Sequence, residues 1–420
     1  MKGSSSARSG ITGAAAVMFL ATLVSGGSDY LFQIVMGRSL GADAYSELAA
    51  VLSILYIVSI PALSVQNIMT RYVSKFHAEG KDGQISWLMR RTLVWVAAFS
   101  FLASGAMLAL SGMLMSALAL SSLMVVALLC VSLFFRMLNP VAAGPLQGLQ
   151  RFNEFGGQLS AQAVVKLGAG WLLVLLGFGI GGALWGVALG AMASTLIPLI
   201  LMRGYIVQKG DPFPLAGLWR YSVPAMVGVL AITILTNVDV VVARFFFDGV
   251  SAGLYAASSN LAKVILFLPG AVSYVMLPKV SDSYTKGEDV WQIVLKAFGI
   301  NIALSLGMVA GYMLLADPLI SVLYGAEYEG ASAYLGILAI SMSLFGMANL
   351  FMILGLSMDS FGYIWVLLFF TVVQVSLFML FHAQLMHLAW AMLVVGLGIC
   401  LSSALLMLHS MSKGRSLLRR

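Results

Sequence analysis

Five charged side chains fall inside stretches of the chain that are otherwise apolar enough for a lipid bilayer. They are Asp29, Arg136, Lys166, Asp239 and Lys263. A charge near the bilayer centre costs about 2.5–3.5 kcal/mol on insertion scales, so such residues normally face a cavity, a partner or a moving ion. We expect these five to mark the functional part of the molecule. The alternative is that they form ion pairs and hydrogen bonds that only hold the helices together.

The basic members of this set predict binding of an anion. The arginine guanidinium matches the geometry of a phosphate, and lysine supplies a point charge. The candidates for contact with an anionic headgroup are Arg136, Lys166, Lys263, Asn260 and Gln147. Gln147 follows Pro140 and Pro145 at the end of its predicted helix, where a plain helix cap is an equally good interpretation.

The acidic members predict binding of a cation. Asp239, with the side-chain oxygen of Asn237 and with Asp29, could bind Na⁺ or carry a proton, because hard cations prefer oxygen ligands and burial readily moves the pKa of a carboxylate. The alternative is a static salt bridge between Asp239 and Lys263 or Arg244. The sequence leaves both interpretations open.

Arg38 and Arg244 end the first and seventh predicted helices on what we expect to be the outer side of the membrane. They are candidates for an outer gate that closes against acidic residues. The alternative is that both are solvated anchors at the membrane interface.

The composition requires a membrane protein. Of the 420 residues, 61% are hydrophobic and 9% are charged, whereas a soluble domain carries about 25% charged residues. Each crossing needs about 20 apolar residues and must be helical, because lipid cannot satisfy free backbone groups. We predict an all-α protein with twelve transmembrane helices, at 11–36, 43–74, 87–110, 114–138, 155–176, 182–203, 219–246, 251–279, 292–315, 331–354, 362–381 and 388–409.

The loops predict the orientation. Eighteen Lys and Arg residues lie on one side of the predicted helices, and only Arg38 and Arg244 lie on the other. The positive-inside rule then predicts that both termini lie in the cytoplasm. We expect the protein to span the cytoplasmic (inner) membrane of the cell. The net charge of +7 therefore reports topology and does not predict a nucleic-acid partner. The first helix resembles a signal peptide, but its apolar pattern continues to Met36.

The chain looks duplicated. The segment RYVSKFHAEGKDG at 71–83 is similar to PKVSDSYTKGEDV at 278–290, and Gly148-Leu149 and Gly355-Leu356 match at the same offset. A polar stretch with Gly and Pro divides the copies. We predict a six-helix lobe at 1–205, a cytoplasmic linker at 206–217 and a second six-helix lobe at 218–420. Parallel repeats of this kind place substrate sites between lobes and work by alternating access.

Motifs for enzymatic chemistry and for metal binding are absent from the sequence. Gly177, Gly179 and Gly182 fit a dinucleotide-binding pattern, but they lie where a turn between two membrane helices is expected. Gly182, Gly186, Gly190 and Ser194 form a seam of small residues typical of close helix packing. The two cysteines and four histidines show no spacing for metal ligands, and we expect neither a resident metal nor a cofactor.

Four segments resemble the polysaccharide exporters of the multidrug/oligosaccharidyl-lipid/polysaccharide (MOP) flippase superfamily. They are GRSLGADAYSELAAVLSILYIVSIPALSVQNIMTRYVSKF (37–76), NVDVVVARFFFDGVSAGLYAAS (237–258), LYAASSNLAKVILFLPGAVSYVMLPKVSD (254–282) and DPLISVLYGAEYEGA (317–331). The resemblance implies a flippase that moves lipid-linked saccharides outward, often coupled to Na⁺ or H⁺. It also implies that Asp239, in the NVD sequence, is the coupling or cavity acid.

Three functions follow from these observations. The first is a flippase for a lipid-linked oligosaccharide or polysaccharide precursor, with membrane lipids and enzymes of polysaccharide biosynthesis as further partners. The second is a Na⁺- or H⁺-coupled multidrug exporter of the same fold, which would want a more acidic cavity. The third is a membrane-embedded glycan ligase or polymerase, which needs a large external loop that the sequence lacks. We favour the flippase, which is not an enzyme.

Overall fold

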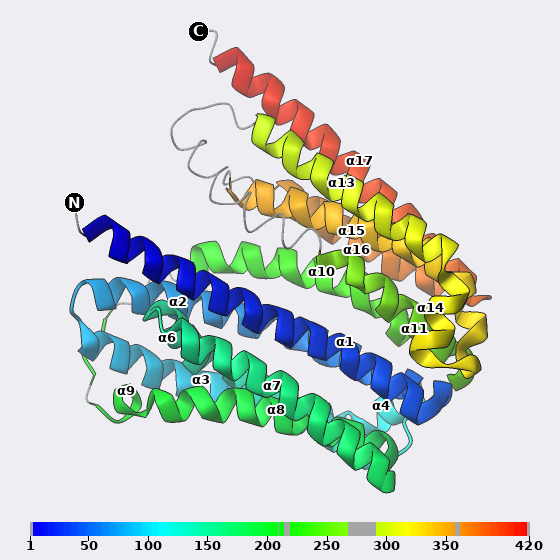
Figure 1. The fold of residues 1–420 in the computed structure, drawn as a ribbon, viewed down its shortest axis with the longest axis horizontal. Helices are drawn as coiled ribbons and strands as arrows, with labels where there is room; N and C mark the ends of the chain where they lie inside the picture. The colour runs from blue at the N-terminus through cyan, green and yellow to red at the C-terminus, as the bar shows by residue number, and fades with distance from the viewer. Residues whose placement is uncertain (1–2, 209, 214–218, 268–290, 358–361, 418–420) are drawn as a thin grey trace. The chain divides into compact units, whose positions relative to one another are not determined.

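The regular structure of the chain is helical in every part that the structure describes. The computed structural model describes residues 3–208, 210–213, 219–267, 291–357 and 362–417 (Figure 1). Packing divides the chain into two compact units, Met1–Met226 and Val227–Arg420, here called unit 1 and unit 2. The second half of the predicted internal repeat, at 278–290, lies outside the described residues.

The helices of unit 1 follow one another with short turns. They are α1 (Gly3–Val58), α2 (Pro61–Ala78), α3 (Asp82–Ala109), α4 (Ser111–Leu118), α5 (Leu123–Leu138), α6 (Pro140–Gly148), α7 (Phe152–Leu173), the π-helical turn η1 (Val174–Phe178), α8 (Gly179–Leu201) and α9 (Arg203–Val207). Within the unit, α7 packs along both α1 and α8, and α2 packs against α6.

The helices of unit 2 begin with α10, whose first turns precede Val227. They are α10 (Trp219–Phe246), α11 (Gly249–Ala262), the 3-10 turn η2 (Lys263–Leu266), α13 (Trp291–Leu314), α14 (Ala316–Tyr324), the 3-10 turn η3 (Ala326–Ala331), α15 (Ser332–Ser357), α16 (Gly362–Leu380) and α17 (Leu385–Leu417). In this unit α15 packs against α11, α13 and α17.

Nine helical stretches among the described residues are long and apolar enough to cross a membrane. Two of them, Val17–Val58 and Phe152–Leu201, are 42 and 50 residues long, about twice the length that one crossing needs. Each of these two overlaps two of the predicted crossings. The predicted crossing at 251–279 is described only as far as residue 267. The prediction of a polytopic all-α membrane protein is confirmed, and the number twelve stays a prediction.

A kink at Gly41 divides α1 into two predicted crossings. The backbone there has φ 75° and ψ 168°, which no helix allows. Glycine reaches this conformation without strain, because it has no Cβ to clash with the neighbouring backbone. The kink therefore allows one helical run to contain the end of the first crossing and the start of the second.

The hairpin of α7 and α8 depends on the seam of small residues. The turn at η1 contains Gly177 in the left-handed region, at φ 88°. A Cβ added at Gly186 would lie 2.6 Å from the backbone oxygen of Lys166, and one at Gly190 would lie 2.9 Å from the Cβ of Lys166. The predictions of a turn at the glycine motif and of close packing along the seam are both confirmed.

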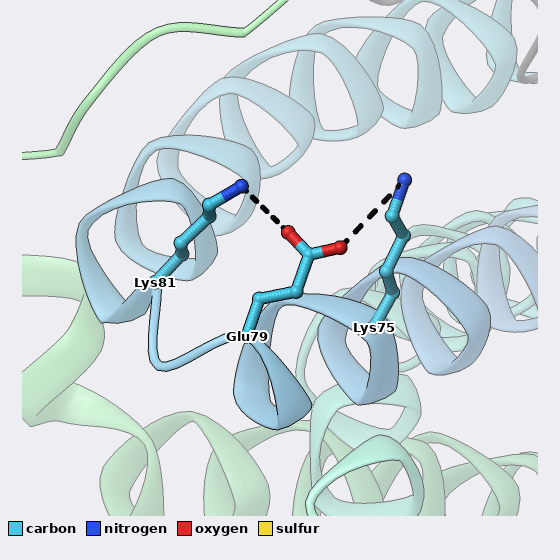
Figure 2. Close-up of polar contacts among 3 residues, drawn as sticks. All are labelled: Lys75, Glu79 and Lys81. Atoms are coloured by element: carbon cyan, nitrogen blue, oxygen red, sulfur yellow. Dashed lines mark hydrogen bonds and ion pairs between the residues drawn. The ribbon is translucent and has the colours of Figure 1, made fainter.

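The turn between α2 and α3 carries a small cluster of exposed charges (Figure 2). The ammonium of Lys81 donates to Glu79 at 2.6 Å, and Lys75 lies 4.0 Å from the same carboxylate. The hydrogen bond from Lys81 lowers the pKa of Glu79 below its ordinary value. Lys75 and Lys81 belong to the set of basic residues that predicts the cytoplasmic side.

Candidate functional site

In unit 1 two of the predicted site residues form an ion pair. The ammonium of Lys166, on α7, donates to Oδ1 of Asp29, on α1. The side chain of Lys166 is 8% exposed, whereas that of Asp29 is 48% exposed. The ammonium also lies 4.7 Å from the ring centroid of Phe32, which allows a cation–π interaction. The lysine is therefore covered by protein, and its carboxylate partner is the more open half of the pair.

Arg136, at the end of α5, has a different environment. Its Nε donates to the hydroxyl of Ser59 at 3.0 Å, and its guanidinium carbon lies 5.0 Å from the ring centroid of Tyr56. Among the residues that the structure describes, no carboxylate lies within ion-pairing distance of this half-buried arginine. Ser59 and Tyr56 fix the guanidinium, and both come from the region where α1 ends. The result is a positioned cation in a membrane segment, whose hydrogen bond within the described residues uses Nε and not the two terminal nitrogens.

Gln147, on α6, lies in a polar cluster with α2. Its Oε1 accepts hydrogen bonds from Gln66 at 3.3 Å and from Thr70 at 3.2 Å. The hydroxyl of Thr70 is also 3.2 Å from the backbone oxygen of Gly144. All three side chains are half-buried. These hydrogen bonds link α2 to α6 through the side-chain amides of Gln66 and Gln147. Both interpretations of Gln147, a helix cap and a contact with a headgroup, stay predictions.

In unit 2 Asp239, on α10, is completely buried. Its Oδ2 accepts a hydrogen bond from the hydroxyl of Ser259, on α11, at 2.6 Å. Its Oδ1 has no hydrogen-bond partner in the described part of the chain. The side chain of Tyr255, also on α11, lies close enough to interact with this carboxylate. A buried carboxylate oxygen without a partner is costly, and the ion-binding role of Asp239 stays a prediction.

Lys263, at the start of η2, lies beside this acid without a direct ion pair. Its ammonium is 3.4 Å from the side-chain oxygens of both Asn237 and Asn260, which are long contacts for hydrogen bonds. The amide nitrogen of Asn237 donates to the backbone oxygen of Thr233 at 2.9 Å, which turns its oxygen toward the lysine. A salt bridge between Asp239 and Lys263, one of the alternatives from the sequence, is not formed among the described side chains.

The two predicted gate residues lie in different environments. Arg38 is exposed, as a solvated anchor would be. Arg244 is only 8% exposed, so the interpretation of both arginines as solvated anchors is wrong for Arg244. It lies in the last turn of α10, where the helix is still packed inside unit 2. The gate role stays a prediction for both.

Three polar residues near these sites did not emerge from the sequence. Glu47, on α1, is buried and accepts from the backbone nitrogen of Ser121 at 2.7 Å. Gln374, on α16, is buried and donates to the backbone oxygen of Leu235 at 3.0 Å, one turn before Asp239 on α10. Ser259 is the hydrogen-bond partner of Asp239. Glu47 is a charge within a predicted helix and could have been found, whereas serine and glutamine carry no such signal.

In both units an acid precedes a buried tyrosine at the same spacing in the sequence. Asp29 precedes Tyr45 by the same number of residues as Asp239 precedes Tyr255. Both tyrosines are fully buried. The hydroxyl of Tyr45 donates to Gln33 at 3.3 Å, whereas Tyr255 lies near Asp239 itself. Comparing the two halves around these tyrosines would have identified the pair of acids from the sequence alone.

Comparisons with known proteins give the family and the fold. The family described as polysaccharide biosynthesis protein matches residues 89–333. No curated protein matches the chain. A multidrug resistance MATE family transporter of the MOP superfamily is similar in structure in its inward-facing conformation, with 14% identity, a TM-score of 0.78, and coverage of 97% of this chain and 99% of that chain.

Two further structures have the same fold at low identity. The lipid II flippase MurJ in an inward closed conformation has 14% identity and a TM-score of 0.71, over 93% of this chain and 87% of that chain. A MATE family transporter in an outward-facing conformation has 16% identity and a TM-score of 0.66, over 96% of each chain. At these identities the likeness concerns the fold alone. Because the family match covers more than half of the sequence, this multi-pass membrane chain belongs to the polysaccharide biosynthesis protein family, and it has the fold shared by these MATE and MurJ structures.

Proposed function

We propose that this protein is a flippase that moves a lipid-linked oligosaccharide or polysaccharide precursor from the cytoplasmic to the outer leaflet by alternating access. The observation that carries the proposal is Arg136. Its guanidinium is oriented by Ser59 and Tyr56 and has no carboxylate partner among the described residues. A fixed arginine is suited to two-pronged contact with a phosphate, the group that joins a polyprenyl lipid to its saccharide.

Asp239 supplies the second part of the proposal. A flippase that works against a gradient needs a group that binds Na⁺ or H⁺, and the buried carboxylate with one oxygen unpartnered is suited to either. Asn237 offers an amide oxygen close by, at the ammonium of Lys263. We assign coupling to this cluster in unit 2 and headgroup binding to Arg136 in unit 1.

The test is transport by the purified protein in liposomes. A fluorescent polyprenyl-pyrophosphate oligosaccharide is loaded on one side, and its exposure to an added glycosidase on the other side is followed over time. We expect protein-dependent exposure, a loss of at least tenfold in rate for Arg136→Ala, and partial recovery for Arg136→Lys, which keeps the charge without the fork.

The competing function is export of organic cations by the same fold. The same liposomes, loaded with a cationic dye and given a Na⁺ or pH gradient, test it directly. Efflux of the dye with no movement of the lipid-linked oligosaccharide would replace the flippase proposal with the multidrug exporter. An Arg136→Ala variant that transports the oligosaccharide as fast as the wild type would remove Arg136 from the substrate site.

A further inference from the structure

The two members of the Asp29–Lys166 ion pair in unit 1 differ in how closely the surrounding protein packs around them. The stem of Lys166 is held by α8, because Gly190 packs on its Cβ and Gly186 packs on its backbone. Phe32 covers the ammonium from α1. These contacts confine the backbone and Cβ of Lys166, and its side chain is only 8% exposed. The cation is therefore the more enclosed half of the pair.

The carboxylate is the half that can move. Asp29 is half-exposed, and its contact with Lys166 is the only hydrogen bond or ion pair of its side chain within the described residues. Among the described side chains and backbone groups, no second donor contacts its other carboxylate oxygen. One rotation about the Asp29 side chain would uncover the ammonium on the open side while leaving the lysine in place.

A carboxylate on a positioned ammonium occupies the place that a phosphate oxygen would take. Both are anionic oxygen acceptors, and each makes a charge-assisted hydrogen bond with an ammonium. A phosphate or pyrophosphate carries more charge than a carboxylate, so it competes well for a lysine in a low-dielectric site. Arg136 in the same unit has no such internal competitor among the described side chains.

We propose that Lys166 is a second binding position for the phosphate-bearing headgroup, and that Asp29 is a built-in competitor that occupies this position until the headgroup displaces it. This inference rests on the proposed function, since it assigns a further contact to the same substrate. It makes Asp29 a counter-ion that limits affinity, rather than a group that couples transport to an ion. Release of Lys166 also leaves Asp29 able to return, so the headgroup is not held too tightly to leave.

Binding to the full-length protein in nanodiscs of neutral lipid tests the competition. The probe is a fluorescent polyprenyl-pyrophosphate oligosaccharide, and inorganic pyrophosphate is used separately as a competitor. Removing the carboxylate in Asp29→Asn is expected to lower the Kd for the lipid about tenfold, equivalent to about 1.4 kcal/mol. The double variant Asp29→Asn with Lys166→Gln is expected to lose that gain. Asp317→Asn, an exposed acid on α14, controls for the change in net charge.

The outcomes separate this inference from the proposed function. If the wild type flips the lipid but Asp29→Asn binds it no more tightly, the competition is wrong and the flippase stands. If the wild type neither binds nor flips the lipid, both fail. A gain for inorganic pyrophosphate alone would mean that the position takes a free anion and not a lipid headgroup. Asp29→Ser removes the same carboxylate and serves if the Asn variant does not fold.

Discussion

The two units each place an acid at the same register ahead of a buried tyrosine, but they neutralise it differently. In unit 1 Asp29 is half-exposed and paired with Lys166 of α7. In unit 2 Asp239 is fully buried, and its hydrogen bond comes from the neutral hydroxyl of Ser259. Gln374 of α16 donates a hydrogen bond to the backbone oxygen of Leu235 on α10, one turn before this acid.

Under the proposed flippase function, this difference separates two tasks, binding of an anionic lipid and binding of a coupling ion. An acid whose charge is already matched by a lysine can act as a replaceable counter-ion for an anionic ligand. An acid that is buried without a direct ion pair among the described residues is the better candidate for binding a coupling ion. We therefore expect substitutions at the two acids and their partners to have different consequences.

The largest effect on stability is expected when the cation of the ion pair is removed. Lys166→Met removes both the ion pair with Asp29 and the contact with the ring of Phe32; the cost should be below the ~3–5 kcal/mol of a fully buried pair, because Asp29 is half-exposed. Thermal unfolding in detergent should show a clear fall in Tm. Lys263→Met is the matched variant in unit 2 and should fall less, because among the described residues Lys263 makes long contacts with two amide oxygens and no direct ion pair. Equal falls would mean that the two lysines have the same role.

The next effect is expected at the partner of the buried acid. Ser259→Ala removes the 2.6 Å hydrogen bond to Asp239, and a hydrogen bond to a charged group contributes about 2 kcal/mol. Ser258→Ala, which removes a neighbouring buried hydroxyl bonded to the backbone of Ala331, controls for loss of a buried serine. If only Ser259→Ala also changes the dependence of transport on Na⁺ or pH, the hydroxyl belongs to the coupling site.

A smaller effect is expected at Asp248. Asp248 follows Asp239 in unit 2 at the same spacing at which Arg38 follows Asp29 in unit 1, so the two positions correspond. Asp248 caps α11 by accepting a hydrogen bond from the backbone of Ser251 at 3.0 Å, and losing such a cap costs about 1 kcal/mol. This hydrogen bond lowers the pKa of Asp248 below its ordinary value of 3.8.

The pH dependence of that cap has a definite sign. Because the pKa is lower in the folded protein, the stabilisation is fully present above pH 3.8 and is lost as the pH falls through the lowered pKa. The Tm difference between wild type and Asp248→Ala should therefore be present at pH 7 and shrink near pH 3. Asp248→Asn should keep most of the cap without this dependence on pH. A difference that grows at low pH would contradict the assignment.

The smallest effect is expected at Glu79, in the exposed cluster of Figure 2. Its contacts with Lys75 and Lys81 are open to water, and exposed ion pairs contribute little because solvent screens them. Glu79→Gln should leave both Tm and transport unchanged in the same assays. A loss comparable to that of Lys166→Met would show that any acid in this protein matters and would undo the comparison between the units.

The sequence predicted the helices well because apolar length alone decides where a chain can cross a bilayer. The predicted helix at 219–246 has the same bounds as α10, and the predicted helix at 292–315 is offset by one residue from α13. Gly41 falls in the gap between the predicted helices at 11–36 and 43–74, but the sequence did not predict that one helical run continues across this kink.

The partners within the site could not be predicted in the same way. Asp29 and Lys166 are 137 residues apart, and periodicity shows which face of a helix is polar but not which helix it meets. The sequence consequently grouped the two acids by charge and left Lys166 with the headgroup candidates. Ser259 escaped notice because a serine in a small-residue helix is as suitable for packing as for binding an acid.

The most direct measurement compares the two acids in one transport assay. Liposomes with wild type, Asp29→Asn or Asp239→Asn are given a Na⁺ or a pH gradient, and flipping of the polyprenyl-pyrophosphate oligosaccharide is followed with and without it. We predict that the gradient accelerates flipping by the wild type and by Asp29→Asn, and that Asp239→Asn loses this acceleration. Loss of the acceleration in Asp29→Asn, with Asp239→Asn unaffected, would contradict the division of tasks between the units.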